Sequence, residues 1–188
     1  MTFADRVREV YRFLSNANYN YMIIGGVAQG VLGEPRLTQD VDIILFLSEK
    51  EVDPFLRSAE KFGFALSHDQ SIQSAKDNLS FRMSFNGLPV DCLIACTAFE
   101  SEALARSFSV SLGGVAVKFP SVEDYILLKL IAGRPKDYLD VSSVAERQKG
   151  HIDLGYIKKW VQSFDKNKEV LVYAPRLDRF LKENELAN

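Results

Sequence analysis

Two aspartates separated by one residue, Asp40 and Asp42, are the side chains of this sequence best placed to do chemistry together. If they lie on a strand, alternation points both carboxylates to one face, while Val41 and Ile43 point the opposite way into a core. A third carboxylate, Asp91, stands alone in an apolar run, Leu-Pro-Val-Asp-Cys-Leu-Ile. We expect the two strands to pair, which would bring the three carboxylates together.

Three neighbouring carboxylates repel one another. At about 4 Å and an effective dielectric constant of about 20, each pair costs roughly 4 kcal/mol, so three pairs would exceed the stability of a typical domain. Such a cluster therefore holds protons or surrounds a cation. Hard oxygen ligands favour Mg²⁺ or Mn²⁺ over zinc. The alternative is that the three act separately, with Asp40 in a turn, Asp42 as a cap and Asp91 facing water.

A glycine pair upstream adds a second kind of candidate site. Gly25 and Gly26 end a short apolar run and open a short helix. Glycine lets an anion approach the backbone closely, and the N–H groups at a helix N-terminus bind phosphate. Arg36 and Thr38 add a cation and a hydroxyl just before the paired aspartates. A Gly-Gly pair alone also fits an ordinary turn, so its meaning depends on the carboxylates.

The segment from Gly25 to Asp42 resembles the signature of the DNA polymerase β-like nucleotidyltransferase superfamily; it reads Gly-Gly-Val-Ala-Gln-Gly-Val-Leu-Gly-Glu-Pro-Arg-Leu-Thr-Gln-Asp-Val-Asp. That signature is a Gly-Gly or Gly-Ser pair, a short helix, an aspartate pair on the next strand and a third aspartate later, where Asp91 fits. The Arg-x-Thr-x-Asp-x-Asp variant looks most like bacterial AbiEii-type and related minimal nucleotidyltransferases, many of which are toxins of toxin–antitoxin pairs. Gly26 departs from the many members that carry serine there, so a hydroxyl contact to the nucleotide phosphate is missing.

The resemblance implies an enzyme that moves a nucleoside monophosphate from an NTP to an acceptor hydroxyl and releases pyrophosphate. It implies that Asp40, Asp42 and Asp91 are catalytic and hold Mg²⁺ or Mn²⁺, with two ions expected. The acceptor is expected to be an RNA or tRNA end or a protein, and a toxin of this kind would have a cognate antitoxin as partner. Two alternatives stay open: transfer to a small molecule such as an aminoglycoside, and a non-catalytic nucleotide-binding or interaction module.

A second resemblance lies in the C-terminal half. The stretch from Lys129 to Asp140 is similar to the Lys…Arg-x-Lys-Asp-x-x-Asp segment that follows the catalytic unit in AbiEii-like proteins. Each residue also has a structural alternative: Lys129 can extend to the surface from its apolar helix, and Lys136 can form a surface salt bridge with Asp140. With both resemblances taken together, the predicted nucleotide-binding residues are Gly25, Gly26, Arg36, Thr38, Lys129, Arg134, Lys136 and Asp140.

The apolar pattern and the resemblance together predict an α/β (α+β) fold, with a mixed β-sheet nucleotidyltransferase core, flanking helices and a C-terminal helical half. We expect the catalytic core over residues 1–118 and a helical region packed on it over 119–188. Asn86-Gly87 predicts a type I′ turn between two strands. Helices are expected over 3–16, 27–32, 50–62, 99–106, 121–131, 136–148, 153–164 and 167–184, strands over 21–24, 41–47, 79–85 and 88–95, a second hairpin over 108–119 and an exposed loop over 67–78.

Composition narrows the setting. Of the 188 residues, 47% are apolar and 26% charged, which excludes an intrinsically disordered chain. No run is long and apolar enough to span a bilayer, so no membrane partner is expected. Two cysteines cannot build a disulfide framework, which favours a cytoplasmic protein. The net charge of −2 argues against a general nucleic-acid coat protein, though not against a nucleic-acid substrate bound through a local basic patch.

Overall fold

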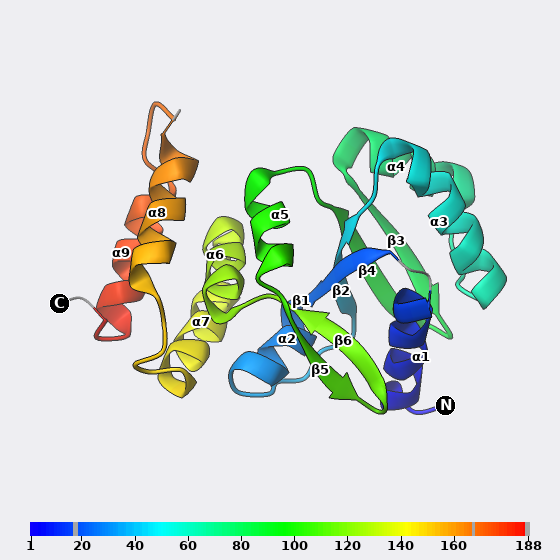
Figure 1. Ribbon diagram of the computed structural model, residues 1–188, viewed down its shortest axis with the longest axis horizontal. Helices are drawn as coiled ribbons and strands as arrows, with labels where there is room; N and C mark the ends of the chain where they lie inside the picture. Colours follow the sequence, from blue (N-terminus) through cyan, green and yellow to red (C-terminus); the bar gives the residue numbers. More distant parts are fainter. Residues whose placement is uncertain (17–18, 167, 187–188) are drawn as a thin grey trace. The chain divides into compact units, whose positions relative to one another are not determined.

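The computed structural model describes every residue except 17–18, 167 and 187–188 (Figure 1). Its residues form two compact units. The first, here called the sheet unit, contains residues 1–27 and 37–120. The second, the helical unit, contains residues 28–36 and 121–188. Among the described helices, none has the length and apolar character needed to cross a membrane.

A four-stranded mixed sheet organises the sheet unit. Its strands are β1 (Asn20–Ile24), β2 (Val41–Phe46), β3 (Ser80–Phe85) and β4 (Leu88–Ile94), in the spatial order β1-β2-β4-β3. β2 and β4 run parallel, whereas β1 and β3 pair antiparallel with their neighbours. The predicted pairing of the two aspartate-bearing strands is therefore confirmed.

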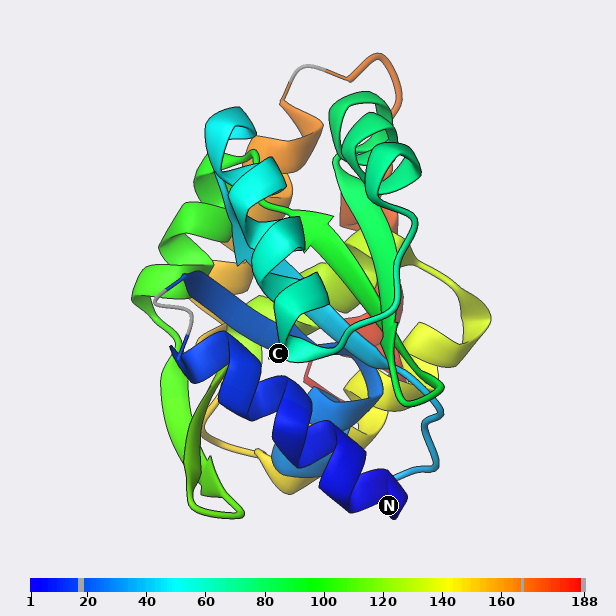
Figure 2. The same ribbon diagram turned by 90° about the vertical axis from the view of Figure 1, so that its right-hand side faces the viewer.

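One face of the sheet is covered by α1 (Phe3–Asn16) and α3 (Glu49–Phe62), which lie in front of it in Figure 2. Both helices carry apolar residues at helical spacing and bury them. The rings of Phe13 and Phe55 meet at 5.5 Å between centroids, and Phe55 lies 5.9 Å from Phe81 of β3. This aromatic packing makes the covered face the core side of the sheet.

Two hairpins follow the predicted turns. Asn86 and Gly87 have φ angles of 47° and 77°, the left-handed values that a type I′ turn needs between β3 and β4. The second hairpin pairs β5 (Phe108–Leu112) with β6 (Val115–Phe119). α5 (Ala98–Ala105) connects the sheet to this hairpin and begins with a capping box.

The expectation of an exposed loop over residues 67–78 is wrong, because this segment forms α4 (His68–Asn78). Tertiary contacts explain the difference. His68 pairs with Asp53 through Nε2 at 2.9 Å and with Glu60 through Nδ1 at 3.0 Å. Both carboxylates belong to α3, so the start of α4 is fixed by contacts that its own polar sequence does not reveal.

The helices expected after residue 120 are found in the helical unit, where they pack against one another. Its last helix begins later than the expected residue 167, which itself lies outside the described residues. Asp165 explains the later start, because its carboxylate accepts hydrogen bonds from the backbone N–H groups of Val172, Tyr173 and Ala174. The helices of this part are α6 (Val122–Ala132), α7 (Pro135–Arg147), α8 (Leu154–Asp165) and α9 (Tyr173–Glu183).

Between β1 and β2 the chain forms α2 (Gly25–Leu32). The first residues of this helix belong to the sheet unit, and the remainder belongs to the helical unit. The helix starts directly at the end of β1, so its N-terminus lies beside the neighbouring strand β2. This arrangement is the strand, glycine pair and short helix that the sequence predicts.

Candidate functional site

Three carboxylates form the centre of the candidate site. Oxygen atoms of Asp40, Asp42 and Asp91 all lie within 4.8 Å of one another, and each of these residues is partly exposed. Of the described residues, only these three form a His, Cys, Asp or Glu group with this spacing. The structure thus brings together the residues that the sequence selects for metal chemistry.

Strand register explains why the carboxylates meet. Asp42 of β2 lies directly opposite Asp91 of β4 in the parallel pair. Their neighbours Val41 and Cys92 are buried on the core side of the sheet, so alternation directs both carboxylates to the other face. Asp40 lies in the bend just before β2 and reaches the same group. Burial also raises the pKa of the Cys92 thiol, which keeps this neighbour neutral.

Gly25 touches this cluster through its backbone. Its φ of 62° is in the left-handed region, and a Cβ there would overlap the Asp42 carboxylate, with the carboxyl carbon only 2.6 Å away. No side chain fits between β1 and Asp42 at this point. Glycine is therefore required twice, by conformation and by space.

Gly26 faces Thr38 at similarly close range. A Cβ on Gly26 would lie 2.7 Å from both Cβ and Oγ1 of Thr38. Serine at position 26 would need this same volume, so the departure from the Gly-Ser form has a steric reason. The Thr38 hydroxyl occupies the space instead and donates a hydrogen bond of 2.7 Å to Oδ1 of Asp40.

Arg82 completes the site from the edge strand β3 and is not among the site residues predicted from the sequence. Register places it opposite Asp91, and its guanidinium holds both carboxylate oxygens, with 2.8 Å from Nη2 to Oδ2. The signal was present in the sequence, because counting outward from the Asn86-Gly87 turn pairs Arg82 with Asp91. The ion pair raises the pKa of Arg82, which stays cationic.

The donor set of this cluster fits hard divalent cations. Carboxylate oxygens are its ligands, and the one thiol nearby, Cys92, is buried on the other face. Arg82 compensates one negative charge, while repulsion of about 4 kcal/mol per close carboxylate pair still favours a cation. Asp40, Asp42 and Asp91 are therefore suited to hold Mg²⁺ or Mn²⁺.

The helical unit gathers most of the other predicted site residues into an ion-pair network. Lys129 is 6% exposed, and its Nζ lies 2.6 Å from Asp140 and 3.2 Å from Asp137. Arg36 forms a two-pronged ion pair with Asp140, and Arg134 forms another with Asp137. Lys129 therefore does not extend to the surface, and Asp140 pairs with Lys129 and Arg36 rather than being held by a surface lysine.

Two opposed effects set the protonation of these buried aspartates. Burial raises the pKa of Asp140, but hydrogen bonds from Arg36 and Lys129 outweigh it and hold that pKa below its usual value. Asp137 behaves in the same way, with Arg134 as its main hydrogen-bond donor. Both carboxylates are thus ionised at neutral pH, and the network is structural in the form described.

The remaining predicted cations lie on the surface of the helical unit. The Arg134 side chain is 57% exposed although it contacts Asp137, and Lys136 is exposed on α7. Lys136 can meet a ligand without breaking this network, whereas Arg134 holds the buried Asp137 carboxylate with its guanidinium. Their assignment to the nucleotide stays a prediction, as does that of Arg36, Lys129 and Asp140.

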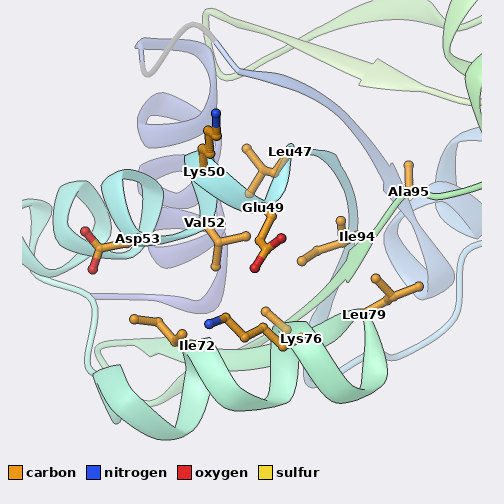
Figure 3. A pocket seen from close by; sticks show the side chains of 11 residues that line it. Leu47, Glu49, Lys50, Val52, Asp53, Ile72, Lys76, Leu79, Ile94 and Ala95 are labelled. Carbon is orange, nitrogen blue, oxygen red and sulfur yellow. The ribbon is translucent and has the colours of Figure 1, made fainter.

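A separate cavity of about 800 Å³ lies at the other end of β2 and β4 (Figure 3). Leu47, which follows β2, and Ile94, which ends β4, line it together with residues of α3 and α4. Asp42 and Asp91 occur earlier on the same strands and are not among its lining residues. The carboxylate site and this mainly apolar cavity are therefore distinct.

Comparison with known families identifies a match over most of the chain. The model of the family described as "Nucleotidyl transferase of unknown function (DUF2204)" matches residues 3–177. This range contains the carboxylate cluster, the glycine pair and the ion-pair network. A sequence search of curated proteins finds no match.

Two solved structures of ANT(2")-Ia share this fold at low sequence identity. A crystal structure of ANT(2")-Ia in complex with adenylyl-2"-tobramycin aligns with a TM-score of 0.61 and 15% identity, over 88% of this chain and 98% of that one. A solution structure of ANT(2'')-Ia aligns with a TM-score of 0.51 and 16% identity, over 97% and 95% of the two chains. A putative nucleotidyltransferase from Thermotoga maritima has a TM-score of 0.48 at 15% identity, over 84% and 91%.

The contact between Gly25 and Asp42 predicts the effect of a single methyl group. Gly25→Ala should destabilise the fold by about 1–3 kcal/mol, from positive φ and from overlap with the carboxylate. Gly30→Ala in the same helix is the matched control, because its Cβ meets no described atom within 4 Å; it should stabilise by up to about 1 kcal/mol. Urea unfolding measures both, and equal effects of the two substitutions would refute the steric account.

The buried network predicts a large effect for its central cation. Lys129→Met keeps the aliphatic stem but leaves Asp137 and Asp140 undercompensated, so we expect a loss of about 3 kcal/mol, at the low end for a broken buried pair because two arginines remain. The exposed Lys136→Met should change stability by less than about 0.5 kcal/mol. Chemical denaturation of both variants measures these changes in the free energy of unfolding. A Lys129→Met protein as stable as wild type would contradict this role.

Proposed function

This chain belongs to the family of nucleotidyl transferases of unknown function whose model it matches, within the DNA polymerase β-like superfamily, and we propose that it uses divalent metal to move a nucleoside monophosphate from an NTP to an acceptor hydroxyl. One observation carries the metal dependence: Asp40, Asp42 and Asp91 converge within 4.8 Å beside a glycine turn that opens a helix. In a protein that had lost the activity, such a repulsive cluster would not be expected to persist, because it lowers stability.

The three aspartates would hold Mg²⁺ or Mn²⁺, with two ions expected. When bound, the ions supply charge neutralisation for the phosphates and a lowered pKa for the attacking hydroxyl. The chain's own residues position these groups. Asp42 and Asp91 are held in register by β2 and β4, and Asp40 is held by the Thr38 hydroxyl.

The donor triphosphate would lie at the glycine turn. Gly25 and Gly26 leave the backbone accessible at the N-terminus of α2, where N–H groups and the helix dipole favour phosphate. Thr38 places a hydroxyl where other members would carry serine, so we assign it a contact to the donor. Arg134 and Lys136, exposed cations of the helical unit, stay predicted nucleotide-binding residues.

In the transfer step, the acceptor hydroxyl oxygen bonds to the α-phosphorus, and the bond from that phosphorus to its bridging oxygen breaks. Pyrophosphate leaves with the bond's electron pair. We assign Asp91 the role of accepting the hydroxyl proton. The protein contributes mainly orientation and charge stabilisation rather than covalent chemistry.

We assign the chain to the AbiEii-like branch, on its Gly-Gly and Arg-x-Thr-x-Asp-x-Asp residues. In that branch the acceptor would be an RNA or tRNA end or a protein in the cytoplasm, and a cognate antitoxin would restrain a toxin of this kind. A small-molecule acceptor is the second candidate, because ANT(2")-Ia, which shares the fold, was solved with adenylyl-2"-tobramycin. Labelled NTPs incubated with Mg²⁺ and either total RNA or tobramycin separate these acceptors.

Asp42→Asn tests the reaction itself. The substitution removes one charge from the cluster, so the fold should persist and gain slightly in stability without metal. Transfer of label from NTP should fall at least about a thousandfold, because a metal ligand and its charge are lost together. Undiminished transfer by a folded Asp42→Asn protein would exclude the proposed role, and Asp69→Asn on α4, outside the cluster, is the control expected to keep full activity.

A further inference from the structure

Arg82 is a cation at the carboxylate site, and it has no function in the reaction proposed above. It lies on β3, an edge strand of the sheet, and its side chain is 73% exposed although it pairs with Asp91. A surface arginine of this kind adds little to stability. Its place beside a proposed catalytic carboxylate makes a role toward substrate the stronger explanation.

The order of strands fixes the side of the site on which Arg82 lies. From one edge of the sheet to the other come Gly25 after β1, Asp42 on β2, Asp91 on β4 and Arg82 on β3. The glycine turn is the proposed seat of the donor triphosphate. Arg82 is therefore at the end of the row away from the proposed donor, on the side left to an acceptor.

The chemistry of a guanidinium indicates what such an acceptor carries. Arg82 uses Nε and Nη2 for Asp91, and the described residues give its Nη1 no hydrogen bond. Arginine binds phosphate through two parallel N–H donors, and it repels cationic ligands. An aminoglycoside bears several ammonium groups, so this edge of the site is poorly matched to it.

We propose that Arg82 binds the last phosphodiester of an RNA chain and so presents the terminal hydroxyl of that RNA as the acceptor. This inference rests on the proposed nucleotidyl transfer and specifies its substrate class. Arg82 shares its donors between Asp91 and the phosphate, which ties the position of the acceptor to a catalytic carboxylate.

The test measures binding, which needs no turnover. A short single-stranded RNA with a fluorescent 5′ label is titrated with the full chain in Mg²⁺, and a second RNA carries an uncharged methylphosphonate in place of its last phosphodiester. Wild type should bind the second RNA about tenfold more weakly, the reduction expected for one charge-assisted hydrogen bond. Because both RNAs meet the same unaltered protein, this comparison is independent of any effect of mutation on folding.

Arg82→Gln should bind the natural RNA about tenfold more weakly than wild type and should no longer distinguish the two RNAs. The slope of log affinity against log salt should fall by about 0.7, as expected when a protein neutralises one fewer phosphate of a single strand. Arg57→Gln is the matched control, since Arg57 is a similarly exposed arginine with a carboxylate partner on α3; its binding should stay within about twofold of wild type.

The outcomes separate this inference from the reaction. Equal binding of both RNAs by wild type, or an equal weakening in the two arginine variants, contradicts the role of Arg82. Transfer of label to tobramycin or to protein, without discrimination between the RNAs, likewise contradicts it and leaves the transfer reaction standing. Discrimination between the RNAs without any transfer of label supports the RNA contact and contradicts the proposed reaction.

Discussion

The repulsion among three carboxylates on one face of the sheet is the constraint around which this site is built. Parallel pairing of β2 with β4 places Asp42 and Asp91 directly opposite one another, and the bend before β2 adds Asp40. In a fold selected only for stability, these charges would lie farther apart. The core on the other face provides the free energy that holds them together, through buried strands and the Phe13–Phe55–Phe81 packing.

The residues around the cluster each compensate its charge or leave space for it. Arg82 and Thr38 provide a positive charge and a hydroxyl donor to two of the carboxylates. Gly25 and Gly26 have no side chains, so the backbone at the start of α2 approaches Asp42 and Thr38 closely. Charge, hydrogen bonding and space therefore all favour this one arrangement, on which the proposed metal and triphosphate site rests.

Much of this site could be predicted because strand geometry is regular. Alternation and the Asn86-Gly87 turn determine which side chains share a face, and Asp91 is found in this way. Arg82 follows from the same turn, but a search for carboxylates passes over it. The α4 segment and the buried position of Lys129 could not be foreseen, since they depend on contacts with Asp53, Glu60, Asp137 and Asp140 that no local pattern encodes.

Counting bound Mn²⁺ by electron paramagnetic resonance shows whether this carboxylate cluster binds divalent metal. With a non-hydrolysable NTP analogue present, we expect two ions per chain in the wild-type protein and fewer ions when Asp91 is changed to Asn. If the wild type bound no Mn²⁺, or if both proteins bound the same number of ions, the proposed metal site would be wrong.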